Sequence, residues 1–303
     1  MTSTIARTPP ARARANVVGA PRPRRPVRPG KRLGKAAVYA AIAFWLAATL
    51  GPYLIMVLTS LTPHSELLKP AVNPIPVNPM FDAYVELFQT TSFLNYLSNS
   101  IITASGAVVF SLLAATTAAI CLSRFRFRGR TAMLTALLIA QLFPAVLLVI
   151  PLQTELRTME LLDSHLGLIL VYSTFATPFA TFLLKNFLDG LPRELDEAAT
   201  IDGCSPFQTV RYVLFPLLRP GLTAAGTYIF IFAWNELLYA LTFTSSTAAQ
   251  TIPVGLQLFI GEYQIRWDLL TAGGVLAAIP VLIGFMLVQR QLISGLTAGA
   301  VKG

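Results

Sequence analysis

Long apolar runs separated by short polar segments dominate the chain. Six stretches are mostly apolar and about 20 residues long, the length that a helix needs to cross the hydrocarbon core of a bilayer. They cover residues 36–58, 101–122, 131–150, 166–187, 221–243 and 269–293. Strands of a membrane barrel would be shorter and would alternate in polarity. The pattern therefore predicts an all-α integral membrane protein with six transmembrane helices.

The composition agrees with this prediction. Hydrophobic residues make up 54% of the 303 positions and charged residues 12%, which is too apolar for a soluble domain of this length. Residues 36–303 are predicted to form one membrane domain. Residues 1–35 are rich in Arg, Pro and Ala and cannot bury a core. They are expected to be a disordered basic tail, which is either solvated or in contact with anionic membrane lipid.

Lys and Arg are divided unequally between the polar segments. Twenty lie in the tail, in segments 123–130 and 185–219 and near the C-terminus, and three lie in the other loops. Because cytoplasmic loops carry the excess of basic residues, both termini and the polar segment 191–220 are predicted to be cytoplasmic. This topology accounts for the net charge of +9 without a nucleic-acid partner. The alternation of Arg and Phe in 123–130 is attributed to the same topology.

The polar segment between the fourth and fifth runs is predicted to form two short helices. The first begins at Pro192 and stops at Gly203, a residue suited to the left-handed turn after a helix. The second has Ser205 as N-cap and Gln208 at N3, which is a capping box, and it ends before Pro216. From local chemistry alone, the helical hairpin is either functional or merely an ordered loop.

The order of residues in this hairpin resembles the EAA loop of permease subunits of binding-protein-dependent ABC importers. The positions carried over are Glu197, Ala198, Ala199, Asp202, Gly203 and Pro216. The family usually has Ile and Leu where this chain has Val213 and Phe215, and both changes remain apolar. The resemblance implies that segment 191–220 is a coupling helix that docks in a groove of a cytoplasmic ATPase.

Two further segments resemble the carbohydrate (maltose-type) branch of that family. Trp234-Asn235-Glu236 is similar to part of its fifth span, and Glu236 is the one acidic residue well inside a predicted span. Such a carboxylate is expected to face a pathway or to form a structural hydrogen bond at the seam between two permeases.

The C-terminal residues 291–303 resemble the family ending GLTxGAVKG. This resemblance implies that the tail inserts near the ATPase pair. The residues concerned are Gly295, Leu296, Thr297 and Lys302.

Over residues 36–303, the resemblance implies a permease subunit of the bacterial cytoplasmic (inner) membrane. Its implied partners are a second permease subunit, two ATPase subunits that bind ATP and Mg, and an extracytoplasmic substrate-binding protein. The implied substrate is a sugar, an oligosaccharide or a related polyol such as glycerol 3-phosphate. A stand-alone secondary transporter or channel is the alternative, and it would need ionisable residues at the midplane of several spans.

Two extracytoplasmic segments have open roles. Phe81, Tyr84, Val85 and Phe88 fall at helical spacing, which predicts a short helix at the membrane surface. It either contacts an external partner or packs over the span ends. In the family, the loop that corresponds to residues 245–268 reaches toward the binding protein. The alternative is that its aromatic side chains only anchor the loop at the membrane interface.

The sequence contains no catalytic constellation. It has no P-loop motif, so we expect neither ATP nor another cofactor to bind this chain, and we expect no enzyme activity. His64 and His165 stand alone in the sequence and are expected to form hydrogen bonds rather than a metal site. Cys121 and Cys204 are predicted to be on the reducing cytoplasmic side, where a structural disulfide is not expected.

Overall fold

The computed structural model describes residues 29–300 apart from 70–74, 77 and 262, and for 29–34 and 290–300 it describes the backbone alone. The chain divides into two compact units, Met1–Gly51 and Pro52–Gly303. The described helices are α1 (Pro29–Ser60), α2 (His64–Leu67), α3 (Asp82–Thr90), α4 (Phe93–Arg124), α5 (Arg130–Leu142), the 3₁₀ helix η1 (Ala145–Leu148), α6 (Val149–Thr158), α7 (His165–Asp189), α8 (Glu194–Ile201), α9 (Pro206–Thr209), the π-helix η2 (Val210–Leu214), α10 (Phe215–Asn235), α11 (Leu238–Phe243), α12 (Ile252–Gln257) and α13 (Trp267–Ala300).

Helices account for most of the described residues. Among the described residues, β-type pairing is limited to one isolated antiparallel bridge, between Ile260 and Ile265. The predicted all-α class is therefore confirmed. Helix α1 begins at Pro29, inside the segment predicted to be a disordered tail. Residues 1–28 of that segment lie outside the described residues.

The predicted spans are found, with one exception. Five described helical stretches are long and apolar enough to cross a membrane, and a sixth crossing exists only if α5 and the helix that follows it are counted together. These two are bent by 97° at their junction, where Phe143 is extended and Pro144 follows. A residue before proline avoids the α-helical conformation, so the third apolar run, 131–150, folds as two helices rather than as one straight helix.

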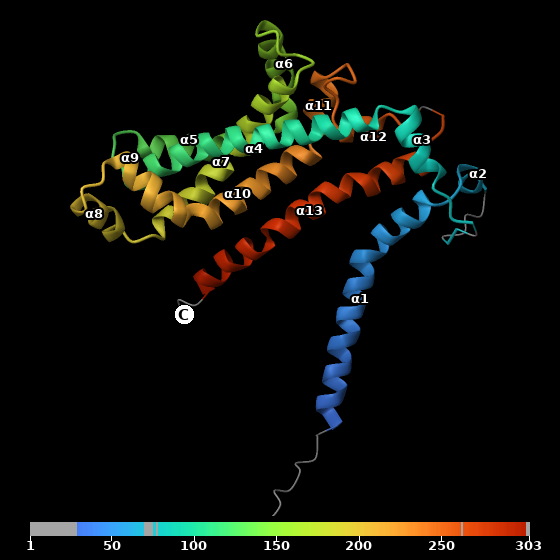
Figure 1. The fold of residues 1–303 in the computed structure, drawn as a ribbon, viewed down its shortest axis with the longest axis horizontal. Helices are drawn as coiled ribbons and strands as arrows, with labels where there is room; N and C mark the ends of the chain where they lie inside the picture. The colour runs from blue at the N-terminus through green and yellow to red at the C-terminus, as the bar shows by residue number, and fades with distance from the viewer. Residues whose placement is uncertain (1–28, 70–74, 77, 262, 301–303) are drawn as a thin grey trace, which may run out of the picture. The chain divides into compact units, whose positions relative to one another are not determined.

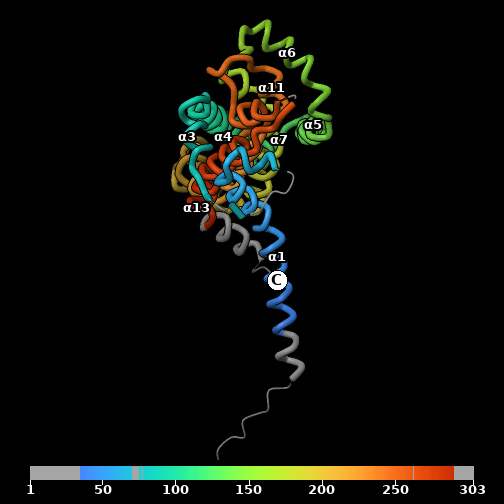
Figure 2. The backbone as a smooth tube through the Cα atoms, turned by 90° about the vertical axis from the view of Figure 1, so that its right-hand side faces the viewer, coloured from blue at the N-terminus to red at the C-terminus, as the bar shows by residue number. Residues whose placement is uncertain are grey.

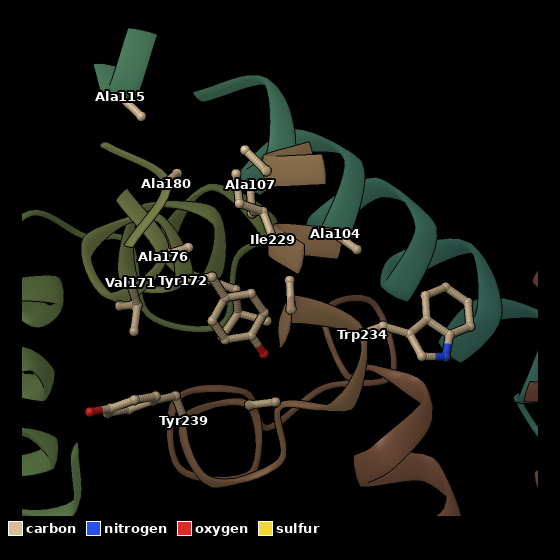
Figure 3. Packing of buried hydrophobic residues seen from close by; sticks show 14 of the residues in the cluster. Ala104, Ala107, Ala115, Val171, Tyr172, Ala176, Ala180, Ile229, Trp234 and Tyr239 are labelled. Carbon is tan, nitrogen blue, oxygen red and sulfur yellow. The ribbon is translucent and has the colours of Figure 1, made fainter. Parts of the chain in front are cut away.

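Helices α4, α7, α10 and α13 lie side by side along the second unit (Figure 1). The pair α4–α7 packs most closely, and small side chains fill its contact, among them Ala104, Ala107, Ala176 and Ala180 (Figure 3). Small residues let transmembrane helices approach closely. At Gly106, a Cβ atom would collide with the side chain of Ile169. These positions hold the two helices together as one body.

The two ends of this bundle carry different elements. Helices α8 and α9 lie at one end, and α3 and α12 lie at the other (Figure 1). Viewed from the α3 end, α6 and α11 lie together on one side of the bundle (Figure 2). The bundle thus places the α8–α9 hairpin far from the elements at the α3 end.

The predicted surface helix exists, but it turns a different face inward than expected. Helix α3 buries Ala83 and Leu87 and packs against α13. Of the four residues at helical spacing, Phe81, Val85 and Phe88 remain exposed, whereas Tyr84 is partly buried and packs against this contact. The apolar periodicity therefore marked mostly the outer face of α3, because the packed face relies on a small residue and one Leu.

Candidate functional site: the α8–α9 hairpin and two broken spans

The turn of the hairpin has the predicted geometry. Gly203 has a φ of 82°, the left-handed conformation that glycine adopts without strain from a Cβ. The N–H of Cys204 donates to the carbonyl of Ala199 at 2.9 Å, which closes the end of α8. The helix begins at Glu194 rather than at Pro192, because residues 192 and 193 form the turn that precedes it. The predicted reversal at Gly203 is confirmed.

The second helix of the hairpin has the predicted start and a different end. The Ser205 N–H donates to Gln208 Oε1 at 2.7 Å, and the Gln208 N–H donates to Ser205 Oγ at 3.4 Å, so the capping box is present. The helix does not stop before Pro216. It continues through the π-helix η2 into α10, and residues 206–235 form one helical stretch. Pro216 directly follows the π-helical turn η2, and such a turn interrupts the regular pattern of α-helical hydrogen bonds at that point.

The residues predicted to contact an ATPase differ in exposure. Glu197, Ala198, Asp202, Gly203 and Pro216 are exposed. Ala199 is 5% exposed and lies in the interior of the hairpin. Of the two alanines, only Ala198 is available to a partner, because one turn of α8 cannot present two adjacent residues on the same face.

Sequence reasoning missed the apolar surface of the hairpin. Ile201 is 87% exposed, Phe207 is 72% exposed and Tyr212 is 65% exposed. Ile201 and Phe207 flank the Gly203 turn, in a segment predicted to face water. Large apolar side chains that are exposed in such a place mark an interaction site. The sequence signal that could have revealed this surface is the presence of large apolar residues in a segment that is otherwise polar.

An ion pair that the sequence did not predict joins the hairpin to the end of α4. Nε of Arg124 lies 2.9 Å from Oδ2 of Asp196 on α8. Nη1 of Arg124 also donates to the Leu188 carbonyl at 3.0 Å. The sequence analysis attributed Arg124 to topology alone, and no local pattern relates it to Asp196.

Glu236 lies in a break of the fifth predicted span, not inside a helix as the sequence suggested. Helix α10 ends at Asn235, and Glu236 is extended before α11 begins at Leu238. Its carboxylate accepts the N–H of Tyr239 at 3.0 Å and the N–H of Ala240 at 3.2 Å. An acidic side chain that caps the free N–H groups of a helix start is favourable. Glu236 therefore has a partner within the chain.

The two broken spans meet at Tyr239. Its hydroxyl donates to the carbonyl of Ala145 at 2.6 Å, directly after the bend at Pro144. Ala145 is the first residue of η1, so this hydrogen bond ties the segment that follows the first break to α11. Tyr239 is buried and lies beside Tyr172 and the α4–α7 core (Figure 3). One residue thus bonds at both breaks, through its hydroxyl to Ala145 and through its backbone N–H to Glu236.

The remaining predicted pathway and tail residues have the following positions. Trp234 is 4% exposed and stacks on Phe230 with ring centroids 5.4 Å apart, so it packs within this chain. Asn235 is exposed, and its Nδ2 donates to the Ile231 carbonyl at 2.7 Å. Residues 295–297 belong to the backbone of α13. Lys302 lies outside the described residues.

A second charged cluster closes the α3 end of the bundle. The Arg266 guanidinium donates to both oxygens of Glu86 at 3.0 and 2.8 Å, and to both oxygens of Asp268 at 3.1 and 2.8 Å. The Asp268 side chain is 5% exposed. Hydrogen bonds that Arg266 donates to Asp268 and Glu86 raise the pKa of Arg266 above its ordinary value. Nδ1 of His64 lies 3.2 Å from Asp268. The cluster joins α2, α3 and the start of α13.

The loop between α11 and α13 is partly fixed to α4. Thr251 and Ile252 are buried, and the Ile252 N–H donates to Ser100 Oγ at 2.8 Å. Asn99 Nδ2 donates to the Gln250 carbonyl at 2.8 Å. This part of the loop is anchored and is not free to reach a partner. The exposed part lies further on, where Tyr263 is 94% exposed.

The described histidines and cysteines do not gather. Nε2 of His165 lies 2.8 Å from Asn99 Oδ1, and the contact of His64 with Asp268 is given above, so both histidines have polar partners as expected. Cys121 and Cys204 are free. Within the described part of the chain, no three His, Cys, Asp or Glu side chains are arranged as metal ligands.

Comparison with known proteins identifies the family. The family described as binding-protein-dependent transport system inner membrane component matches residues 107–297, which include the hairpin, the break after α5 and the break between α10 and α11. The sulfoquinovosyl glycerol transport system permease protein SmoH of Agrobacterium fabrum is 34% identical, over 89% of this chain and 95% of its own. The diacetylchitobiose uptake system permease protein DasC of Streptomyces coelicolor is 37% identical, over 83% of this chain and 91% of its own.

A solved structure has the same fold. It is a chain of a bacterial ABC transporter involved in the import of the acidic polysaccharide alginate, with a TM-score of 0.76 and 22% identity, over 87% of this chain and 98% of that chain. The family match, the permease relatives and the apolar helices agree with one another. The chain belongs to the family of binding-protein-dependent transport system inner membrane components, and it is a multi-pass inner-membrane permease subunit of an ABC transporter rather than an enzyme.

Proposed function

We propose that this chain forms the membrane pathway of an ATP-driven sugar importer together with a second permease subunit. The named relatives transport a sulfoquinovosyl glycerol and a diacetylchitobiose, and this supports a sugar, an oligosaccharide or a related polyol such as glycerol 3-phosphate as the substrate. An extracytoplasmic binding protein delivers it, and the exposed stretch around Tyr263 is the surface that meets that protein. Membrane lipid surrounds the spans.

The observation that carries the proposal is that the hairpin at one end of the bundle exposes large apolar side chains. Ile201 and Phe207 on either side of the Gly203 turn are suited to a groove on another protein. Helix α9 continues without interruption to Asn235, so a force applied to the hairpin passes directly into the membrane. We assign the hairpin to docking on an ATPase subunit.

The ATPase subunits supply the chemistry in this proposal. Two of them bind ATP and Mg, and this chain binds no cofactor. The exposed Glu197 pairs with a basic group on the ATPase, and the exposed Ala198 lets α8 sit close in the groove. Asp202, Gly203 and Pro216 complete the docking segment. The tail residues Gly295, Leu296, Thr297 and Lys302 lie near the ATPase pair.

The distribution of charge supports a cytoplasmic hairpin. The Arg-rich turn after α4 lies at the same end of the bundle as α8, since Arg124 pairs with Asp196. Arg266 lies at the opposite end, which is poor in basic residues. By the positive-inside rule, this distribution supports a cytoplasmic location for the hairpin and both termini. A thiol reagent that cannot cross membranes should label a cysteine at Tyr263 in intact cells, and it should spare one at Gln208.

The alternative of a stand-alone secondary transporter or channel rested on ionisable residues within the spans. Glu236 was the main candidate, and its carboxylate is used to cap α11. With that group engaged, the described spans offer no argument for a proton or ion relay. The family of the chain favours the ATP-driven importer.

The docking role is tested with Ile201→Asp and Ala198→Trp in complexes reconstituted with the partner permease, the ATPases and the binding protein. Burial of an Ile side chain stabilises a contact by about 1.5–3 kcal/mol, so Ile201→Asp should weaken ATPase binding by roughly 10- to 100-fold. Leu258→Asp is the control, because Leu258 is 58% exposed and belongs to the opposite end. Uptake is followed with labelled trehalose, diacetylchitobiose and glycerol 3-phosphate. ATPases that stay bound in both hairpin variants, with wild-type uptake, would refute the docking role.

A further inference from the structure

Arg124 lies at the meeting point of α4, α7 and α8. It is the last residue of α4, and its side chain is 10% exposed. It faces Asp196 on α8. It also donates to the carbonyl of Leu188 in the last turn of α7 at 3.0 Å and to the carbonyl of Leu191, just after that helix, at 3.5 Å. The last carbonyls of a helix have no partner within the helix, and a basic side chain satisfies them well.

A second arginine crosses the same junction in the opposite direction. Nη2 of Arg193, just before α8, donates to the Ser123 carbonyl at the end of α4 at 3.2 Å. Oγ of Ser123 donates to Oδ1 of Asp189 on α7 at 2.6 Å. Asp189 also pairs with Lys185, one turn earlier. The ends of α4 and α7 and the start of the hairpin are therefore joined by a continuous polar network.

Apolar packing does not fill the space between α8 and α4. A cavity of about 370 Å³ lies there, and it is lined by Ile120 and Arg124 on α4 and by Asp196, Glu197 and Thr200 on α8. Helix α8 packs instead against α9 and η2. A displacement of α8 would therefore close the cavity without moving α4, unless a rigid contact bridges it. The Arg124–Asp196 ion pair lies in the wall of this cavity and joins α8 to α4 beside it.

We propose that Arg124 is a positioning residue for coupling. It fixes α8 to the α4–α7 body, so that a movement of the hairpin reaches two routes in the membrane: the continuous helix into α10, and the ion pair into α4 and α7. The inference rests on the proposed docking of the hairpin on an ATPase. Arg124 has no contact with substrate or nucleotide in this scheme.

An arginine is required at this position for a geometric reason. Its planar group presents donors in several directions and can reach the Asp196 carboxylate and the α7 carbonyls at once, whereas a lysine offers one ammonium. Arg126 in the same turn is exposed. It provides a matched control, because its loss removes the same charge from the same turn and leaves the junction intact.

The test compares Arg124→Gln, Arg124→Lys and Asp196→Asn with Arg126→Gln in the reconstituted complex. The measured ratio is the number of ATP molecules hydrolysed for each labelled sugar imported, using the member of the sugar panel that the wild type imports. Arg124→Gln and Asp196→Asn should raise this ratio at least roughly fivefold, the lower end of coupling effects between sites, while the ATPases stay bound. Arg124→Lys should be intermediate, and Arg126→Gln should match the wild type.

A measurement that does not depend on the sugar follows the junction itself. Spin labels on the native Cys121 near the end of α4 and on Thr200→Cys in α8, with Cys204→Ser, report one distance by pulsed electron resonance. Addition of ATP should leave this distance unchanged in the wild type, because the two helices move together. In Asp196→Asn the distance should change or broaden. The exchange Arg124→Asp with Asp196→Arg should restore part of the coupling.

The two proposals fail in different ways. If Arg124→Gln and Asp196→Asn keep the wild-type ratio and the wild-type distance, Arg124 has no positioning role, although the hairpin still docks. If Ile201→Asp leaves the ATPases bound, the docking role itself is wrong. Should Arg124→Gln fail to insert, the Asp196→Asn ratio decides, because Asp196 lies outside every span and outside the basic turn.

Discussion

The two ends of the bundle use arginine in different ways. At the α3 end, Arg266 meets two carboxylates, each with two hydrogen bonds, and joins α3 to the start of α13. At the α8 end, Arg124 meets one carboxylate as an ion pair and donates to two backbone carbonyls. Both ends expose large apolar side chains, Val85 and Phe88 at the first and Ile201 and Phe207 at the second. The ends differ in how firmly an arginine joins their elements, because Arg266 holds two carboxylates whereas the side-chain link from Arg124 to α8 is a single ion pair.

The comparison predicts that changes at the α3 end alter stability, whereas changes at the α8 end alter coupling. The largest expected effect is that of Arg266→Ala, which leaves the buried Asp268 without its partner. Loss of one member of a fully buried pair is strongly destabilising, by about 3–5 kcal/mol. Because Arg266 is 33% exposed, we expect about 2–3 kcal/mol, less than for a fully buried pair.

Thermal unfolding of the detergent-solubilised protein measures this effect. Arg157→Ala is the control, since Arg157 is exposed and on the same predicted side of the membrane. ATP hydrolysed per sugar imported should stay at the wild-type value in the protein that remains folded. A changed ratio with unchanged stability would contradict the separation of the two ends.

A smaller effect is expected at the other end, for Gly203→Val. A residue with a Cβ costs about 1–2 kcal/mol in the left-handed conformation. A Cβ at this position would meet no atom within 4 Å, so the strain is confined to the backbone. We expect the hairpin to tilt and ATPase binding to weaken by roughly tenfold, without a change in membrane insertion.

Gly203→Asn sharpens this prediction, because asparagine tolerates the left-handed conformation. It should bind the ATPases nearly as well as the wild type. Co-purification of the ATPase subunits with each variant gives the comparison. Equal loss for Val and Asn would mean that side-chain contacts at the turn matter, rather than its backbone conformation.

The smallest expected effect concerns Asp163, between α6 and α7. Partial burial acts to raise the pKa of this carboxyl, but hydrogen bonds from the backbone N–H groups of Ser246 and Ser245 outweigh it and lower the pKa. The charged form is therefore favoured by folding. The stability that this carboxylate contributes is fully present above its pKa in the unfolded chain, about 3.9. This stability is lost as the pH falls through the lower pKa of the folded protein.

Unfolding temperatures measured between pH 6 and pH 3 check this sign. Asp163→Asn should lower stability by about 1 kcal/mol or less near neutral pH and should reduce the loss on acidification. Asparagine suits the positive φ of 54° at this position. A variant that becomes more sensitive to acid than the wild type would contradict the assignment.

Sequence patterns predicted the features that depend on local chemistry. Five spans follow from unbroken apolar runs, and the Ser205 capping box and the Gly203 turn follow from residue types within one helical turn. The bend at Pro144 was marked by the proline itself. Hydropathy did not predict that the span breaks into two helices there, because it reports how apolar a segment is and not the direction of its helix axis.

The features that sequence analysis missed depend on contacts between distant segments. Glu236 looked like a charge within a span, because the apolar run continues past it and hides the end of α10. Ala199 matched a family motif, but a motif does not tell which side of a short helix is buried. The pairing of Arg124 with Asp196 joins separate cytoplasmic segments, and only the packing of α4 against α7 brings them together.

The hydrogen bond between Tyr239 and Ala145 has a consequence for biosynthesis. The two residues are 94 positions apart. At about 5–20 residues per second, a ribosome needs roughly 5–20 s to make the tyrosine after it has made the alanine. During this interval the bent third segment is already synthesised, but the Ala145 carbonyl has no tyrosine hydroxyl to accept from. The contact between the two broken spans can therefore form only after the fifth segment has been made.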